Sequence, residues 1–152
     1  LSLLFSLWWS RTAEGKVEWV ILTEKHLATN EKERKRIEAL DGAVFSGRVF
    51  GTLAISRSLG DRDYKMPTSE ANFVSSEPHT SVVTVSDDDQ FLLLACDGLW
   101  EKLSYAAACD FVLQQFANDV SAQDVSAALA QEAINLGSMD NVTAIVIRLN
   151  VK

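Results

Sequence analysis

The feature that most constrains the fold is a pair of short segments that are apolar at nearly every position. Residues 91–95 read FLLLA and residues 142–149 read VTAIVIRL, with Thr143 and Arg148 as the exceptions. Because successive side chains of a strand point to opposite faces, a segment that is apolar on both faces belongs inside a sheet. The sequence therefore predicts two interior strands.

Further strands are indicated elsewhere in the chain. Residues 17–22 (VEWVIL) predict one, and the apolar residues 1–9, too short to cross a membrane, predict a buried one. Residues 80–85 predict another, joined antiparallel to residues 91–95 by a solvated turn at 87–89. Residues 44–50 predict a small hairpin or a tight turn at Ser46-Gly47.

The first helix is indicated by a capping box. Asn30 can cap it while Glu33 stands at the third helical position, which predicts a helix over residues 31–40. Its charge run, EKERKR, mixes signs. We expect a solvated face with an ion pair between Glu31 and Lys35.

Two later helices follow one another directly. Ser104 and Ser121 are suitable N-cap residues for them. Apolar residues at helical spacing then predict one core-facing stripe on each helix. These stripes are Cys109, Val112, Leu113 and Phe116, and Val125, Ala128, Leu129, Ala133 and Leu136. A run of helices beside mostly antiparallel strands predicts the α+β class.

Composition excludes several classes of protein. The chain has 152 residues, a formal net charge of −7 and a pI near 4.8, which fits one ordinary domain and disfavours a nucleic-acid partner. Cys96 and Cys109 lie in apolar surroundings and predict buried free thiols, which favours the cytoplasm or nucleus. Two histidines, His26 and His79, are isolated in the sequence, so no metal site is expected from them.

Two aspartates stand where a cation could be held. Asp97 follows residues 91–95 and precedes a glycine, and Asp140 lies in the loop that leads into residues 142–149. Carboxylates at strand ends, with a glycine that permits close backbone approach, suit hard cations such as magnesium or manganese. Asp before Gly is also ordinary turn chemistry, and the pattern alone leaves both interpretations open.

Three stretches carry a resemblance to a known family. Residues 53–61 (LAISRSLGD), 91–100 (FLLLACDGLW) and 137–146 (GSMDNVTAIV) resemble, in order, signatures of the type 2C metal-dependent protein serine/threonine phosphatases, the PPM family. The resemblance runs over residues 17–149 and corresponds to the C-terminal half of the catalytic domain. It implies that residues 1–152 are a single partial phosphatase domain, poorly matched over residues 1–16.

The resemblance implies a fold and a chemistry. The fold is a β-sandwich flanked by antiparallel helices, in α-β-β-α layers, of which the N-terminal half is missing here. The chemistry is hydrolysis of phosphoserine and phosphothreonine in a phosphoprotein substrate at a binuclear magnesium or manganese centre. Asp97 and Asp140 match carboxylates that hold one of the two metals, and no catalytic residue beyond metal ligands is implied.

Other matched positions have supporting roles. Gly98 and Asn141 flank the two aspartates, and Asn141 is expected to orient Asp140. Arg57 and Asp61 resemble a paired Arg and Asp that fix a loop near the site. Residues 24–48 correspond to a flap that the family uses in substrate choice.

Departures from the family pattern limit the expected activity. An early acidic pair, an Asp-Gly-His-Gly element and a phosphate-binding Arg are not found in the sequence. Two carboxylates alone hold two hard cations poorly, so this fragment should be inactive without a complementary N-terminal half. The alternative is a catalytically dead interaction module or a gene-model fragment. A cysteine phosphatase is disfavoured because Lys102 stands where its loop needs Arg, six residues after Cys96.

Overall fold

The computed structural model describes residues 5–11 and 17–149, with side chains described from residue 19 onward. The chain divides into two compact units. Residues 24–80 form the central unit, and residues 5–11, 17–23 and 81–149 belong to the sheet unit. Each unit is described by itself.

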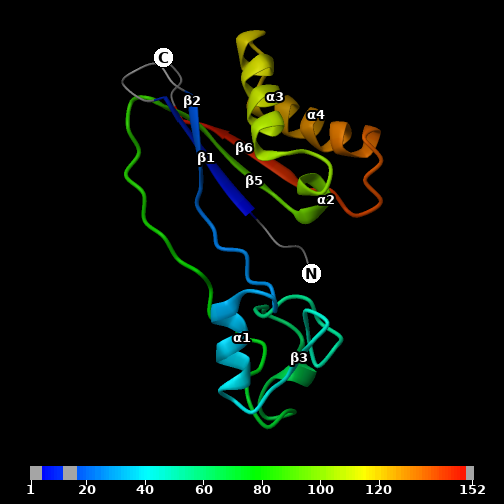
Figure 1. The fold of residues 1–152 in the computed structure, drawn as a ribbon. Coiled ribbons are helices and arrows are strands. Elements are labelled where there is room, and N and C mark those ends of the chain that lie inside the picture. Colours follow the sequence, from blue (N-terminus) through cyan, green and yellow to red (C-terminus); the bar gives the residue numbers. More distant parts are fainter. Residues whose placement is uncertain (1–4, 12–16, 150–152) are drawn as a thin grey trace. The chain divides into compact units, whose positions relative to one another are not determined.

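The sheet unit contains a four-stranded antiparallel sheet in the order β2-β1-β5-β6 (Figure 1). Its strands are β1 (Phe5–Arg11), β2 (Val17–Ile21), β5 (Asp89–Ala95) and β6 (Ala144–Arg148). The interior position of β5 confirms the expectation for residues 91–95. The strand expected over residues 1–9 is confirmed from Phe5 onward, and residues 1–4 lie outside the described residues.

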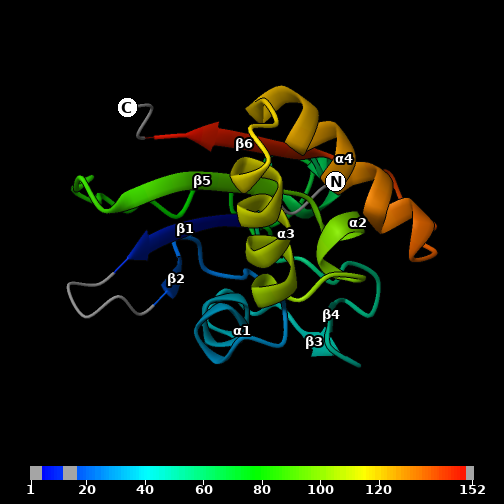
Figure 2. The same ribbon diagram turned by 90° about the horizontal axis from the view of Figure 1, so that it is seen from above.

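Two long helices cover one face of this sheet (Figures 1 and 2). The short helix α2 (Asp97–Trp100) follows β5, and α3 (Tyr105–Ala117) and α4 (Ala122–Asn135) follow in turn. The hydroxyls of Ser104 and Ser121 accept hydrogen bonds from helix amides, as expected for N-caps. Of the expected stripe on α4, Leu136 is instead half exposed because it follows the last helical turn.

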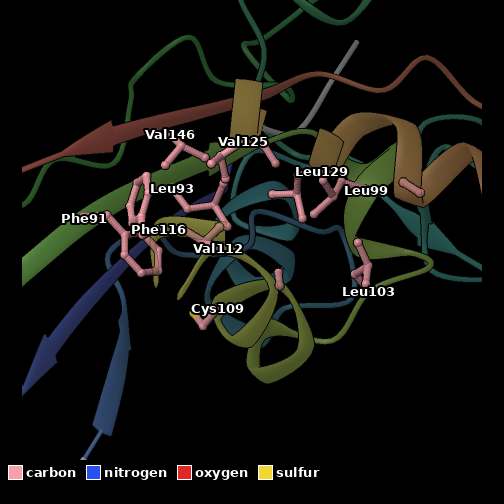
Figure 3. Packing of buried hydrophobic residues seen from close by; sticks show 13 residues of the cluster. Phe91, Leu93, Leu99, Leu103, Cys109, Val112, Phe116, Val125, Leu129 and Val146 are labelled. Carbon is pink, nitrogen blue, oxygen red and sulfur yellow. The ribbon is translucent and has the colours of Figure 1, made fainter. Parts of the chain in front are cut away.

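The core of the sheet unit lies between the sheet and these helices (Figure 3). It contains alternate residues of β5 and one stripe of residues from each of α3 and α4. Burial therefore repeats every two residues along the strand and about every 3.6 residues along the helices, as expected where helices pack on a sheet. Its labelled members in Figure 3 are Phe91, Leu93, Leu99, Leu103, Cys109, Val112, Phe116, Val125, Leu129 and Val146.

The opposite face of the sheet differs from expectation. Val20, Ile145 and Ile147 are exposed at 49%, 47% and 44%. The pairing register places all three on the face opposite Leu93 and Val146. The prediction that residues 142–149 are buried on both faces is wrong for the sheet unit, because β6 is its edge strand and the helices cover one face only.

A second correction concerns residues 80–85, which form no strand. Both hydrogen-bonding edges of β5 are already occupied, by β1 and by β6. No edge of β5 is therefore left for residues 80–85 to join. The solvated turn expected at 87–89 is also shorter, since Asp89 belongs to β5, is buried, and accepts a 2.6 Å hydrogen bond from the Ser86 amide.

The central unit has little regular structure. It contains α1 (Glu31–Glu38), the two-residue strands β3 (Val44–Phe45) and β4 (Arg48–Val49), and a 3-10 turn, η1 (Arg62–Tyr64). Ser46 and Gly47 turn the hairpin with φ of 50° and 74°, the left-handed values that a tight hairpin turn requires. The expected hairpin is confirmed.

These observations confirm the α+β class. Within the described residues, one sheet carries helices on one face, so the second sheet and the outer helix layer of a sandwich stay a prediction. The single-domain boundaries also stay a prediction. None of the described helices is both long and apolar enough to cross a membrane.

Candidate metal centre

Asp97 stands at the end of the interior strand β5. Cys96 is the N-cap residue of α2, and Asp97 is the first residue of that helix. The helix is held against the strand, because the Trp100 indole donates a 2.9 Å hydrogen bond to the Ala95 carbonyl oxygen. The backbone that carries Asp97 is therefore anchored on both sides.

The loop that carries Asp140 is fastened to this same segment. The Cys96 amide donates to the Thr143 carbonyl oxygen at 3.1 Å, and the Ser138 hydroxyl donates to the Gly98 carbonyl oxygen at 2.8 Å. These contacts lie on either side of Asp140 in the sequence. They bring the backbones around Asp97 and Asp140 together.

Gly98 makes this close approach possible. A Cβ at position 98 would overlap the carbonyl oxygen of Asn141. That carbonyl is also bound by the Cys96 thiol, which donates to it at 3.1 Å. Glycine is therefore required here by space, as the sequence interpretation of Asp97-Gly98 expected.

Each aspartate has one oxygen engaged locally. Oδ1 of Asp97 accepts from the Gly98 amide at 3.2 Å, and Oδ1 of Asp140 accepts from the Asn141 amide at 2.7 Å. Among the described residues, Oδ2 of neither aspartate makes a hydrogen bond. Asp140 is exposed and Asp97 is half-buried. Asn141 thus touches Asp140 through its backbone amide.

The two thiols are structural. Cys96 is fully buried, donates to Asn141 and accepts from the Thr143 amide at 3.1 Å. Burial raises the pKa of Cys109 to about 12, with the Asp110 charge adding to the shift. Both cysteines are free, which confirms the expectation. A thiol packed under a loop in this way is a poor nucleophile.

Glu33 overturns the capping-box interpretation in the central unit. Asn30 caps α1 by accepting from the Lys32 amide at 2.9 Å, while the Glu33 side chain is only 4% exposed. Its Oε1 accepts from Arg57 at 2.7 and 2.9 Å and its Oε2 from Arg36 at 3.2 Å. The capping-box prediction is wrong, because the Glu33 carboxylate binds Arg36 and Arg57 instead of the Asn30 amide.

The charge run is therefore only partly a solvated face. Glu31 and Lys35 form the expected exposed pair at 2.6 Å, but Arg36 turns inward to the carbonyl oxygens of residues 56, 72 and 73. Burial by itself would raise the pKa of Glu33, yet the hydrogen bonds from Arg57 and the charge of Arg36 bring it to about 2.

Arg57 and Asp61 do not form the expected pair. Arg57 binds Glu33 and the carbonyl oxygen of Glu77. Asp61 adopts a left-handed φ of 57°, and its buried Oδ2 has no hydrogen-bond partner in the described part of the chain. The carboxylate partner of Arg57 is instead Glu33, which lies 24 residues earlier in the sequence.

A second group of metal-ligand side chains was missed by the sequence interpretation. Glu24, His26 and His79 have candidate ligand atoms within 4.8 Å of one another. The two imidazole rings are 6.0 Å apart between centroids, so the view of these histidines as isolated is wrong. Burial, with the Arg57 charge, lowers the pKa of His26 and favours the neutral ring. No sequence signal links positions so far apart along the chain.

Comparison with known proteins finds the family that the three motifs resemble. The family model described as "Protein phosphatase 2C" matches residues 10–142. Protein spalten of Dictyostelium discoideum is 42% identical over 133 residues, which are 88% of this chain and 13% of that protein. Human Protein phosphatase 1A is 37% identical over 131 residues, 82% of this chain and 34% of that protein.

Solved structures agree as well. The structure titled "Structure of a C.elegans sex determining protein" matches with a TM-score of 0.78 and 30% identity, covering 98% of this chain and 36% of that one. A phosphatase of Toxoplasma gondii matches with a TM-score of 0.77 and 27% identity, covering 99% and 47%. The chain belongs to the protein phosphatase 2C family, and it spans less than half of the length of these relatives.

Proposed function

We propose that the chain is the C-terminal half of a metal-dependent protein serine/threonine phosphatase domain, in which Asp97 and Asp140 hold one divalent cation. The observation that carries the proposal is the fastening of the 137–143 loop to the 96–98 segment. It holds two aspartates on adjacent backbone segments, each with one carboxylate oxygen left without a hydrogen bond among the described residues.

The donor set supports the kind of ion. Carboxylate oxygens are the ligands that magnesium and manganese prefer. Such ions, when bound, activate water and offset charge on the phosphoryl oxygens. This chain's own residues position the carboxylates: Gly98 permits the approach, and the Asn141 amide orients Asp140.

The exposed face of the sheet supports the proposal that the domain has a second half. Val20, Ile145 and Ile147 present exposed apolar side chains on the face opposite α3 and α4. We propose that a complementary N-terminal half completes a sandwich and supplies the remaining metal ligands. Residues 1–152 alone are then inactive on a phosphoprotein substrate. Two buried free thiols are in keeping with a cytoplasmic or nuclear location.

Complementation tests this proposal. The purified chain is mixed with the N-terminal half of a family relative, and manganese-dependent hydrolysis of a phosphoserine peptide is measured. We expect no turnover by the chain alone and turnover by the mixture. Asp97→Asn and Asp140→Asn should each lower turnover by about 100-fold or more, because one charged ligand of the cation is lost.

The matched control is Asp110→Asn, which removes an exposed carboxylate from α3. It should leave turnover within about twofold. Full turnover in the Asp97 or Asp140 variants would refute the assigned ligands. A mixture that forms a stable complex but neither hydrolyses the peptide nor takes up manganese would favour the interaction module.

A further inference from the structure

The two ends of the central unit meet at a group of three potential ligands. Glu24 and His26 precede α1, and His79 lies near the last residue of the unit. The Nδ1 atom of His79 is 4.0 Å from Oε2 of Glu24, and all three residues offer ligand atoms within 4.8 Å of one another. It is the one such group of three found among the described residues.

His26 is an unsatisfied member of this group. Both of its ring nitrogens are buried and make no hydrogen bond within the described part of the chain, and the side chain is 11% exposed. Its Nδ1 faces Oε1 of Glu33 at 3.3 Å, but that oxygen already accepts two hydrogen bonds from Arg57. Buried polar atoms without partners are rare and costly, so such a ring points to a ligand.

We propose that Glu24, His26 and His79 bind a divalent transition-metal ion, with zinc as the best fit. Two imidazole nitrogens and one carboxylate oxygen suit zinc, whereas magnesium prefers oxygen alone. A histidine ligand usually has its other ring nitrogen beside a carboxylate. Oε1 of Glu33 lies 3.3 Å from Nδ1 of His26, close enough to become such a partner when Nε2 binds the ion.

The geometry requires only small side-chain movements. Ligand atoms around one tetrahedral zinc ion lie about 3.4 Å apart, given zinc–ligand bonds of about 2.1 Å. The side chains of Glu24 and His79 are 46% and 31% exposed, so they are free to rotate toward His26. Lys32, which pairs with Glu24 at 3.3 Å, is 80% exposed and is easily displaced.

Both positive and negative charges lie near the proposed site. Arg57 lies close enough to His26 to repel a cation, but its guanidinium is bound to the Glu33 carboxylate. Glu24 adds a further negative charge at the site. A bound ion would join residues 24 and 26 to residue 79, and because it binds the folded unit and not the unfolded chain, its binding free energy would add to the stability of the unit.

Binding of zinc chloride to the metal-free full chain tests the proposal. We expect one ion to bind, with loss of at least 10-fold in affinity for His79→Ala and for Glu24→Gln, measured by calorimetry. Glu31→Gln, which removes an exposed carboxylate from the same unit, is the matched control and should bind zinc like the parent chain. Because the chain has two histidines, zinc should shift the ring signals of both in NMR spectra.

A second control separates this site from the proposed phosphatase centre. The double variant with Asp97→Asn and Asp140→Asn should retain zinc binding at Glu24, His26 and His79. The NMR ring signal of His26 checks that the central unit of each variant is folded, and tryptophan fluorescence checks the sheet unit. Equal zinc affinity in the parent chain and in His79→Ala would overturn the proposal. Loss of zinc binding in the double aspartate variant, with binding retained in His79→Ala and Glu24→Gln, would also overturn it.

Discussion

The two units of this chain differ in what fills their interiors. Among the residues whose side chains are described, 13 buried ones of the sheet unit form one apolar cluster between β5, β6 and the helices α3 and α4. In the central unit, the apolar cluster has five described buried residues, and the buried carboxylate of Glu33 pairs with the partly exposed Arg36 and Arg57. A small apolar core leaves more of the fold to polar contacts.

This difference teaches where each unit is vulnerable. The stability of an apolar layer depends on how much apolar surface it buries. Substitution of a single polar side chain outside that layer therefore has little effect. A buried carboxylate shared by two arginines behaves otherwise, because removing it leaves two charges without a partner. We therefore expect the central unit to depend on one residue to a degree that the sheet unit does not.

The chain offers separate probes for the two units. All four tryptophans, at positions 8, 9, 19 and 100, belong to the sheet unit, and both histidines belong to the central unit. Tryptophan fluorescence therefore follows one unit, and histidine ring signals in NMR spectra follow the other. Each can be recorded on the same sample during unfolding by urea.

The largest effect is expected for Glu33→Gln. The amide cannot neutralise Arg36 and Arg57, so the free energy of unfolding of the central unit should fall by about 3–5 kcal/mol. The histidine signals should lose their dispersion at lower urea concentration, while the tryptophan transition stays nearly unchanged. Glu31→Gln, whose partner Lys35 is exposed, should cost less than about 0.5 kcal/mol. Equal shifts of both probes would show that the units unfold as one.

A second effect comes from the low pKa of Glu33. Its pKa of about 2 lies below the ordinary value of 4.5. The stabilisation is therefore complete above about pH 5 and is lost as the pH falls through 4.5 toward 2, by roughly 3 kcal/mol in total. The lowered pKa of His26 acts in the same direction, and its loss begins as the pH falls through 6.5.

Amide NMR signals of the central unit during urea unfolding at pH 7, 5 and 3 measure this dependence. The parent chain should weaken mainly between pH 5 and pH 3, and Glu33→Gln should show a much smaller change over that interval. An unchanged urea midpoint between pH 5 and pH 3 in the parent chain would contradict the role of the ionised carboxylate.

Local rules predicted much of the sheet unit. The caps at Ser104 and Ser121 and the apolar stripes of α3 and α4 follow from spacing within a few residues. The position of residues 80–85 did not follow, because it depends on which strands already flank β5. Strand propensity is visible in sequence, whereas the occupancy of a sheet edge is a property of the whole fold.

The central unit shows why the polar groups were harder to predict. Glu33 satisfies the capping-box pattern and also serves as the partner of a distant arginine, and the sequence alone favours the local use. His26 and His79 have no shared motif, and only the fold brings them together. For Asp97 and Asp140 the order of family-like motifs was informative, and their role as metal ligands remains a prediction.

The smallest effect that distinguishes the units is that of Ser121→Ala. In the sheet unit, the Ser121 hydroxyl accepts from the Asp124 amide at 3.2 Å and donates to the Asp124 carboxylate at 2.6 Å. Both contacts are local to the start of α4, so their loss should lower the free energy of unfolding by about 1 kcal/mol. Tryptophan fluorescence in urea measures it. The control is Gln123→Ala, an exposed position two residues further on, which should change the free energy of unfolding by less than about 0.5 kcal/mol. A loss as large as that of Glu33→Gln would mean that the sheet unit also depends on single polar residues, and the contrast between the two interiors would fail.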